Sequence, residues 1–484
     1  MTQHSLIWFR NDLRVQDSPA LAAAIEAGRP IIPVYIHAPD EEGDWPAGAA
    51  SRWWLHHALV DLAEALDEAG LPLVIRRGGS LETLRALAAE FDVSTVYWNR
   101  RYEPAIVERD EEVAAALDKD GLEVRTSNAA LLFEPGEVCN QSGEPYRVFT
   151  PFWKSLRSRE PAAPVEVDVA AATAPEHSPE SLPPDALGLL PDHGWDAGLA
   201  EAWDPSLQGA HRVLHDFIDG PVSDYKACRD RPGVRGTSRL SPYLHFGQLG
   251  PRQAWRAVLQ AGRSDGQGGY TFLSELAWRE FAHHLLHFFP DTPGQALNEA
   301  YRNFPWQRDE EYLRAWQRGQ TGFPMVDAGM RELWQTGWMH NRVRMLAASF
   351  LVKHLLQPWQ DGARWFWDTL VDADLANNTM GWQWTAGCGA DAAPYFRIFN
   401  PILQGEKFDP KGRYVRRYVP ELADLPDKYI HQPWEAPDEV LKEAGVKLGQ
   451  DYPHPVIGHR EGRERALEAL SENKARNQQR ESSS

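Results

Sequence analysis

Five short runs rich in β-branched and aromatic residues occur in the first 128 residues of the chain. They are SLIWFR, PIIPVYI, LPLVIRR, STVYWN and LEVRTS. Amphipathic stretches near 18–27, 52–69, 80–90 and 105–119 separate them. This alternation predicts βαβ units on a parallel sheet, so we expect a doubly wound α/β domain over residues 1–130. Neither a GxGxxG fingerprint nor a P-loop follows the first run.

The rest of the chain divides into a connector and a helical region. Residues 160–193 are rich in Pro, Ala, Asp and Glu with little periodicity, which is typical of a surface segment between domains. From about residue 205 onward, helical spacing dominates and strand signals are absent. We therefore predict an interdomain connector over 131–204 and an all-α domain over 205–484.

Composition limits the class of protein. With 484 residues, 43% of them hydrophobic, and 20 Trp, the chain can bury a large core in two or more domains. Cys139, Cys228 and Cys388 lie far apart, which argues against a disulfide framework, structural zinc or an iron–sulfur cluster. The N-terminus shows no signal-peptide pattern and no apolar run reaches membrane-spanning length. We expect a cytoplasmic monomer with no membrane partner and no metal.

The net charge of −19 argues against a nucleic-acid partner, because phosphate binding requires Lys and Arg. The distribution of charge qualifies that argument. One short segment has six basic residues against two acids: Arg397, Lys407, Lys411, Arg413, Arg416 and Arg417 against Glu406 and Asp409. This segment is either a basic face on an acidic body or a solvated charge run.

The stretch from Asp372 to Pro401 begins with two carboxylates, Asp372 and Asp374, and combines them with adjacent amides, two tryptophans and a Gly- and Ala-rich turn. Buried Asp and Asn side chains need hydrogen-bond partners, while Trp382 and Trp384 offer wide aromatic faces. The mixture predicts a pocket that binds a polar aromatic group. A flavin with a base stacked nearby would fit.

Two helical segments carry polar and aromatic side chains where an amphipathic helix would usually bury Leu or Ile. Residues three and four apart share a helix face, and in SELAWREF such a face holds Glu275, Trp278 and Arg279. The corresponding face of WMHNRVRM consists of Asn341, Arg344 and Met345. A surface salt-bridge cluster is the alternative for each face alone, but two such faces favour a site.

The segment GTSRLSPYLHFG places short hydroxyls around Arg239 just before a predicted helix. They belong to Thr237, Ser238 and Ser241. Hydroxyls and free backbone N–H groups in this position can form a phosphate cradle. Helix capping is the alternative, because Ser and Thr cap helices routinely.

Eight motifs of this chain resemble, in order, those of the photolyase/cryptochrome family. They are RNDLRVQD, SRWWLHH, GTSRLSPYLHFG, WREF, GWMHNRVRM, GWQW, DAAPYFRIFNP and QGEKFDP. The resemblance covers nearly the whole chain. It implies an N-terminal α/β domain that holds an antenna chromophore, a helical domain that holds FAD in a U-shaped conformation, and a cavity for a DNA lesion beside the flavin.

The resemblance also implies a branch of the family. The lesion-cavity positions of cyclobutane pyrimidine dimer photolyases correspond here to Glu275, Trp278, Asn341, Met345 and Trp384. The (6-4) branch has histidines where Asn341 and Met345 stand. Asn378 matches the neighbour of flavin N5 and resembles the repair enzymes, whereas plant-type cryptochromes have Asp there and animal ones Cys. TAGCGADAAPYFRIFNP and IHQPWEAP are most similar to bacterial class III photolyases.

These likenesses imply light-driven repair of cyclobutane dimers in DNA, by electron transfer from excited reduced FAD to a flipped-out dimer. The implied catalytic residues are Glu275, which would contact the dimer, Asn341 and Asn378. The implied FAD contacts are Tyr225, Thr237, Ser238, Arg239, Leu240, Ser241, Phe272, Arg279, Arg344, Asp372, Asp374 and Asn378. The charges of Arg344 and Asp372 are expected to pair near the flavin ring.

Further roles follow from position in the same way. Electrons would reach oxidised flavin through Trp306, Trp359 and Trp382, with Trp365 and Trp367 as an alternative branch. Contacts to DNA or the lesion would come from Arg229, Glu275, Trp278, Asn341, Arg342, Met345, Trp384, Arg397 and Gln404. Phosphate contacts position the DNA and do not read its sequence.

The antenna position is less well matched, because WNRRYEP lacks the Asn-Glu pair of the best-known folate-binding class I enzymes. The likeness to class III nevertheless favours 5,10-methenyltetrahydrofolate, with 8-hydroxy-5-deazaflavin as the alternative. Its contacts would be Glu42, Trp45, Trp53 and Glu103. A purely structural role is the alternative for each of the four.

Two other functions compete with repair: a cryptochrome-type blue-light receptor and a flavoprotein that only transfers electrons. Signalling members often carry long C-terminal extensions, whereas only about 25 residues follow His459 here. A plain electron-transfer role would leave Met345 and Trp384 unexplained. The sequence therefore favours the repair enzyme.

Overall fold

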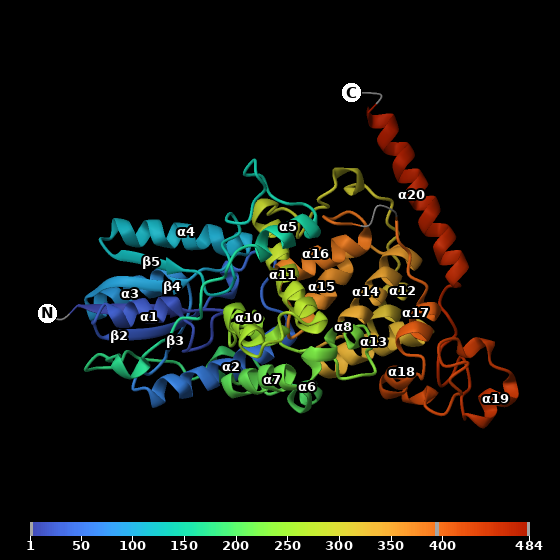
Figure 1. Cartoon of the computed structure of the whole chain (residues 1–484), viewed down its shortest axis with the longest axis horizontal. Helices are drawn as coiled ribbons and strands as arrows, with labels where there is room; N and C mark the ends of the chain where they lie inside the picture. Colours follow the sequence, from blue (N-terminus) through green and yellow to red (C-terminus); the bar gives the residue numbers. More distant parts are fainter. Residues whose placement is uncertain (1–2, 393–395, 482–484) are drawn as a thin grey trace. The chain divides into compact units, whose positions relative to one another are not determined.

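The computed structural model describes residues 3–392 and 396–481. Part of the DAAPYFRIFNP motif, residues 393–395, lies outside the described residues. The chain forms two compact units (Figure 1). The first comprises Met1–Ser223, Ser238–Pro290 and Val371–Leu375, and the second comprises Asp224–Thr237, Asp291–Leu370 and Ala376–Ser484.

A five-stranded parallel sheet forms the core of the first unit, in the order β3-β2-β1-β4-β5. The strands are β1 (His4–Phe9), β2 (Ile31–His37), β3 (Val74–Arg77), β4 (Val93–Asn99) and β5 (Glu123–Ser127). Strands covered on both faces are nearly continuous apolar runs, and β1 and β4 are buried over most of their length. The predicted doubly wound α/β domain is confirmed.

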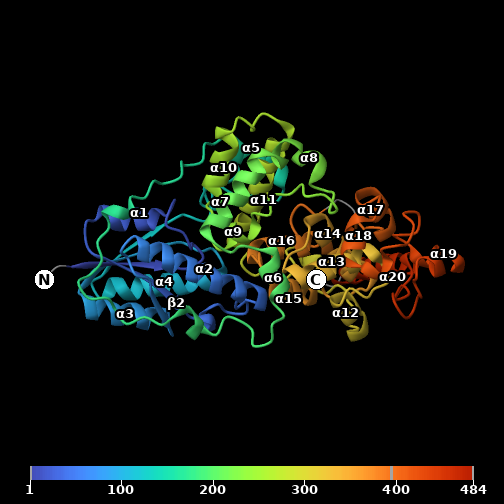
Figure 2. The same ribbon diagram turned by 90° about the horizontal axis from the view of Figure 1, so that it is seen from below.

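Four helices connect these strands: α1 (Pro19–Glu26), α2 (Ala49–Glu68), α3 (Ser80–Phe91) and α4 (Pro104–Lys119). Right-handed crossovers place α1 on one face of the sheet, against β1 and β4, and α3 beside α4 on the other (Figure 2). The chain turns in opposite directions from β1 and from β4. Ligands of open α/β sheets bind at such a switch point, beyond the carboxyl ends of the strands.

The first unit also contains a helix inside the segment that we predict as a connector. Phe149, Phe152, Trp153 and Leu156 recur at helical spacing and are buried in α5 (Phe149–Arg157), which packs on α11. The other helices of this unit are α6 (Ala197–Ala202), α7 (Leu207–Asp219), α9 (Ser241–His245), α10 (Pro251–Gln260) and α11 (Gln267–Phe288). A Pro- and Ala-rich segment follows α5 and conceals it in the composition.

The second unit is helical, and its described residues contain no strand longer than an isolated bridge. Its helices are α8 (Tyr225–Cys228), α12 (Glu310–Gln317), α13 (Pro324–Thr336), α14 (Asn341–Ser349), α15 (Trp359–Thr369), α16 (Leu375–Ala386), α17 (Pro401–Phe408), α18 (Arg413–Tyr418), α19 (Asp438–Glu443) and α20 (His459–Glu481). A π-helical turn, η6 (Phe350–His354), continues α14. No helix in the described part of the chain is long and apolar enough to cross a membrane.

Buried carboxylates join the helices of this unit. Glu332 on α13 accepts hydrogen bonds from the Tyr414 hydroxyl at 2.6 Å and from the His340 amide at 3.1 Å. Asp327 on the same helix accepts from the Thr321 amide at 2.7 Å and from the Tyr452 hydroxyl at 2.6 Å. Because buried acceptors need such donors, these bonds fix where α14 and α18 begin.

A pair of imidazoles joins α20 to η6. Nε2 of His354 lies 2.9 Å from Nδ1 of His459. Burial lowers the pKa of His354 to about 3, and the nearby His459 adds to that effect. Burial also lowers the pKa of His459. Both rings are therefore neutral in the folded protein at neutral pH.

We expect acid to weaken this junction. Between pH 6.5 and the low pKa of folded His354, the unfolded chain binds a proton that the folded chain does not. The free energy of unfolding therefore falls as the pH drops below 6.5, by up to about 1.4 kcal/mol per pH unit. Thermal unfolding at pH 7 and pH 5 measures this loss. A His354→Phe variant should lose less stability over that range, and an equal loss in both proteins would contradict the prediction.

Candidate functional site

A cleft with an empty volume of about 510 Å³ opens beyond the carboxyl ends of β1 and β4. Asn11 and Asp12 enter it directly after β1, and residues 100–103 enter it directly after β4. The remaining lining residues are Asn99, Ala129, Ala130, Leu244, His245, Gly247, Leu249, Pro251, Arg279, His283 and Asp374. The cleft thus occupies the switch point of the sheet, where a ligand site is expected.

Asp374 is the main negative charge in this cleft. Its carboxylate lies 3.4 Å from Nε2 of His283 and 3.9 Å from Nδ1 of His245. Burial alone would raise the pKa of Asp374, but His283, His245 and Arg279 outweigh burial and hold that pKa well below its ordinary value. Burial would lower the pKa of His283, but Asp374 reverses the direction and raises it. Each group of the pair therefore favours the charged form of the other.

The cleft brings together Arg279 and Asp374, both predicted FAD contacts, and Glu103, a predicted antenna contact. The sequence analysis missed His245 and His283. The signal that could have found the cleft is the position of polar residues directly after the predicted first and fourth strands.

Arg101 joins two of the predicted antenna residues. Its guanidinium lies 2.7 Å from Glu103 and 3.8 Å from Glu42. Burial would raise the pKa of Glu103, but Arg101 prevails and lowers it to about 2. Trp45 is half-buried, whereas Trp53 is 1% exposed and packs edge-on to His57. The carboxylates of Glu42 and Glu103 therefore lie on the same guanidinium, that of Arg101. Trp53 belongs to the buried core.

The hydroxyl-rich segment has the local structure of a tight loop. Arg239 adopts a left-handed backbone conformation, with φ at 54°, and its guanidinium lies 4.2 Å from the centre of the Trp203 ring. Oγ of Ser238 accepts from the Leu240 amide at 3.4 Å. Helix α9 begins at Ser241, so the predicted order of loop and helix is confirmed.

Two more predicted FAD contacts lie on helices, one in each unit. Phe272 is buried on α11 and packs against Phe217, with ring centres 4.7 Å apart. Tyr225 is buried at the start of α8, where the guanidinium of Arg229 lies 5.7 Å from its ring centre.

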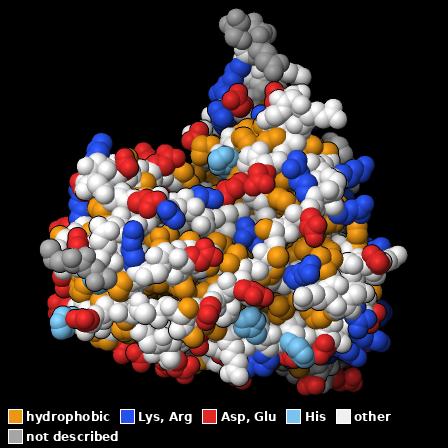
Figure 3. Space-filling model, turned by 60° about the vertical axis from the view of Figure 1, so that its left-hand side comes forward, with side chains coloured by type: hydrophobic (Ala, Val, Ile, Leu, Met, Phe, Trp, Pro, Cys, Tyr) orange, Lys and Arg blue, Asp and Glu red, His pale blue; other side chains and the backbone are white. Residues whose placement is uncertain are grey.

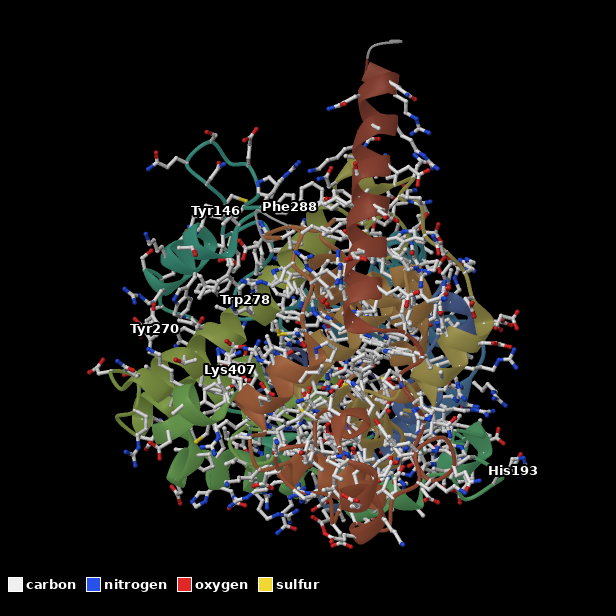
Figure 4. The ribbon with its side chains drawn as sticks, turned by 90° about the vertical axis from the view of Figure 1, so that its right-hand side faces the viewer. Tyr146, His193, Tyr270, Trp278, Phe288 and Lys407 are labelled. Atoms are coloured by element: carbon white, nitrogen blue, oxygen red, sulfur yellow. The ribbon has the colours of Figure 1, made fainter. Side chains whose placement is uncertain are left out.

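Helix α11 presents Glu275 and Trp278 one turn apart, both half-buried. Figure 4 labels Trp278 on this helix. The ring of Phe149 lies parallel to the Trp278 indole, with ring centres 3.7 Å apart and 9° between the planes. The sequence analysis missed Phe149, because it did not predict α5.

Helix α14 presents Asn341, Arg344 and Met345 at the predicted spacing. His340 caps its start, since Nδ1 accepts from the Arg342 amide at 3.2 Å. Burial lowers the pKa of His340 to about 4, so the cap is a neutral imidazole. The Arg344 guanidinium donates to the Met339 carbonyl at 2.7 Å, and its pairing with Asp372 stays a prediction.

Carboxylates lie beside the predicted DNA contact Arg342 and beside two residues of the basic segment. Arg342 donates from Nε and Nη2 to Asp230 at 3.2 and 2.9 Å. Asp427 likewise pairs with Lys411 and Arg416. Arg397 packs on Phe399, and Gln404 belongs to α17. On the face drawn in Figure 3, acidic, basic and apolar side chains are interspersed. The basic run is thus partly neutralised by its neighbours.

Helix α16 follows Asp374 directly, and Asn378 and Gly381 continue the same helix face. Nδ2 of Asn378 donates to the Ala363 carbonyl at 3.0 Å. A Cβ added at Gly381 would meet no atom of the described residues within 4 Å, apart from its own helix and chain neighbours. Open space therefore adjoins a face that carries a carboxylate and an amide.

Two family models and several known proteins match this chain over most of its length. Residues 5–171 match the family model of DNA photolyase, and residues 272–472 match that of the FAD binding domain of DNA photolyase. A deoxyribodipyrimidine photo-lyase of Agrobacterium fabrum is 49% identical over 96% of this chain and 97% of its own length. The chain belongs to the photolyase/cryptochrome family. Cryptochrome-1 of Arabidopsis thaliana is 40% identical over 97% of the chain and 70% of its own length.

Solved structures of the family share the fold. A bacterial class III photolyase from Agrobacterium tumefaciens superposes with a TM-score of 0.95, at 48% identity and over 98% of both chains. A Synechocystis cryptochrome gives 0.88 at 30% identity, over 97% of this chain and 99% of its own. The predicted family and the predicted α/β and helical architecture are confirmed.

The residues of this family member fit FAD. The open face of α16 at Gly381 can take a flat ring, and Asp374 and Asn378 on the same face can hydrogen-bond its polar edge. Within the described residues, no group of three metal-ligating side chains could hold a metal ion.

The tryptophans expected to carry electrons in this family lie in the second unit. Trp382 is 2% exposed and packs against Phe366 and Trp316, at 5.0 and 6.1 Å between ring centres. Gly362 permits this position, because a Cβ there would lie 2.1 Å from Cη2 of Trp382. Trp359 is also buried, and Trp306 packs on Phe304 at 4.4 Å.

The alternative branch also has a structural basis. Trp365 on α15 stacks on Trp334 of α13, with ring centres 6.1 Å apart and 6° between the planes. Trp334 is 53% exposed. Trp365 precedes Phe366, which packs on Trp382. The stacked pair of Trp365 and Trp334 therefore offers a second route to the solvent that does not include Trp306.

Proposed function

We propose that this chain repairs cyclobutane pyrimidine dimers in DNA, driven by light. The observation that carries the proposal is the occurrence of two helix faces, Glu275 with Trp278 on α11 and Asn341 with Met345 on α14. The named photo-lyases among the relatives support it. Histidines at the two α14 positions would instead have favoured (6-4) lesions.

FAD, when bound in its reduced form, supplies an excited-state electron. The chain must bind it, and the proposed contacts are Tyr225, Thr237, Ser238, Arg239, Leu240, Ser241, Phe272, Arg279, Arg344, Asp372, Asp374 and Asn378. The neutral amide of Asn378 can accept a hydrogen bond without taking a proton, which suits repair better than a carboxylate would.

The lesion must leave the duplex to react, as the substrates of base-flipping enzymes do, and photolyases are a known example of that group. Trp278 and Trp384 are the proposed stacking walls, each contributing roughly 1–3 kcal/mol per stacked base. Glu275 and Asn341 are the proposed hydrogen-bond partners of the pyrimidine edges. A hydrogen bond donated by the Asn341 amide, or by Glu275 as a neutral carboxylic acid, would stabilise the negative charge that the dimer gains.

Blue light and a duplex with a single thymine dimer test this proposal directly. The chain loaded with reduced FAD should restore the dimer to two thymines, and no restoration should occur in the dark. The likeness to Arabidopsis cryptochrome-1 keeps a blue-light receptor as the second candidate. A chain that holds FAD but leaves dimers intact under light would favour that candidate.

For the antenna we propose 5,10-methenyltetrahydrofolate beside Glu42, Trp45, Trp53 and Glu103, with 8-hydroxy-5-deazaflavin as the alternative. Carboxylates such as Glu42 and Glu103 can accept hydrogen bonds from a pterin amino group. The absorption spectrum of the purified chain separates the two chromophores by the position of the band that adds to the flavin bands.

DNA binding should weaken as salt rises, despite the net charge of −19. The proposed phosphate contacts are Arg229, Arg342 and Arg397, which are charged, and Gln404, which is neutral. Each phosphate that an arginine neutralises releases counterions, so for three such phosphates raising salt from 50 to 200 mM should weaken binding roughly 40-fold. Fluorescence anisotropy of a labelled duplex measures this slope.

The variant Arg397→Ala should reduce the slope of log affinity against log salt concentration by about one, the contribution of one phosphate contact. Arg85→Ala is the matched control, because Arg85 pairs with Asp120 on the α/β part of the chain and is not a proposed contact. An affinity independent of salt, or equal slopes for both variants, would refute the proposed contacts.

A further inference from the structure

Two aromatic residues of α5 differ in what they touch. Phe149, the first residue of the helix, is 7% exposed and stacks face to face on Trp278 at 3.7 Å. Phe152, one turn later, is 2% exposed and packs on Phe281 at 5.1 Å and on His284 at 5.2 Å. Only the first of these rings covers a proposed lesion contact.

The geometry of the Phe149 contact is unusual for a core. Aromatic pairs generally prefer edge-to-face or clearly offset arrangements, as Trp278 and Phe281 adopt at 73° between planes. A parallel ring at 3.7 Å covers one face of the indole and opposes its rotation about the side-chain bonds. Trp278 remains half-buried, so part of the indole is still exposed although Phe149 covers one of its faces.

Holding an aromatic side chain in place before binding matters for affinity. A mobile side chain loses conformational freedom when a ligand immobilises it, and a side chain already fixed does not. Only ligands that use that side chain benefit. Undamaged duplex, whose bases stay stacked and paired, has no base to place against Trp278.

We propose that Phe149 is a positioning residue that fixes the Trp278 indole as a preformed wall of the lesion cavity. This inference rests on the proposed function. The expected effect is on the preference of the protein for damaged over undamaged DNA. Helix α5 would thus help to set this preference, although the helix lies in the segment that connects the sheet to the helical region.

The test measures dissociation constants in the dark, by anisotropy, for a duplex with one thymine dimer and for the same duplex without it. The full-length, FAD-loaded chain is used throughout. Phe149→Leu should weaken binding of the dimer-containing duplex roughly three- to tenfold, with undamaged duplex unchanged. Phe149→Tyr should retain the wild-type preference, because its ring can stack in the same way. Phe152→Leu is the matched control and should leave the preference unchanged.

A double-mutant cycle separates positioning from a general structural effect. In a Trp278→Leu background, Phe149→Leu should cause no further loss, because the side chain on which it acts is absent. An equal loss in both backgrounds, or an unchanged preference in Phe149→Leu alone, would overturn the inference. If the Phe149→Leu variant fails to load FAD, the same dissociation constants are measured for Phe149→Met, with the same expected loss of preference for the damaged duplex. A wild-type chain that does not prefer damaged DNA would instead refute the proposed function itself.

Discussion

Glu275→Ala, loaded with reduced FAD, should split thymine dimers with a quantum yield lowered roughly tenfold or more. The reason is electrostatic: a hydrogen-bonding group fixed beside the pyrimidine edge stabilises charge that arises on the dimer, and a group of this kind is worth one to three orders of magnitude in other enzymes. FAD content should remain normal, since Glu275 is not a proposed FAD contact. Repair under counted photons, with flavin absorbance as the loading check, measures the effect.

The amide variant refines this prediction. Glu275→Gln keeps the shape of the side chain and can donate a hydrogen bond from its amide, so it should retain more activity than Glu275→Ala. Glu299→Ala is the control, because Glu299 is 79% exposed on a surface turn. A flavin-loaded Glu275→Ala that repairs at the wild-type yield would remove this residue from the lesion site.

Trp306→Phe should slow the photoreduction of oxidised FAD by about tenfold or more. Trp306 is the proposed outer end of the path from Trp382 through Trp359. Without an oxidisable outer ring, the electron vacancy stays in the interior and recombines. Transient absorption of the oxidised protein measures the rate. Repair by chemically reduced protein should persist, because the donated electron then returns without using the path.

The stacked pair of Trp365 and Trp334 gives this experiment a second arm. If Trp306→Phe photoreduces at the normal rate, the path through Trp306 is wrong. In that case Trp334→Phe, which removes the exposed member of the pair, should be the variant that slows the reaction.

The sheet was predictable because each of its strands is a local signal. Runs such as IIPVYI contain enough β-branched residues to mark a buried parallel strand without knowledge of their neighbours. Helix α5 was not, because it is only nine residues long and is followed by a Pro- and Ala-rich segment. Signals of that length are ambiguous without tertiary contacts.

Without the resemblance to the family, spacing groups candidate site residues only where they share a helix. Glu275 with Trp278 and Asn341 with Met345 follow from helical spacing alone. The contact of His283 with Asp374 joins residues 91 positions apart, and no local pattern reports such a pair. Phe149 illustrates the same limit, because its role is visible only through the ring on which it stacks.

The phase of α16 has a consequence for how this chain can vary. Asp374, Asn378 and Gly381 share one face only because they are spaced four and then three positions apart along the chain. Inserting or deleting a single residue between Asp374 and Asn378 would turn everything that follows by about 100° relative to Asp374, so the carboxylate and the amide would no longer face the same side. Substitutions at such a place are local, whereas a change in length reorients Gly381, Trp382 and Trp384 together. The number of residues between Asp374 and Gly381 is therefore as constrained as the identity of the residues on this face. Insertions and deletions are tolerated instead in the irregular segment before α6.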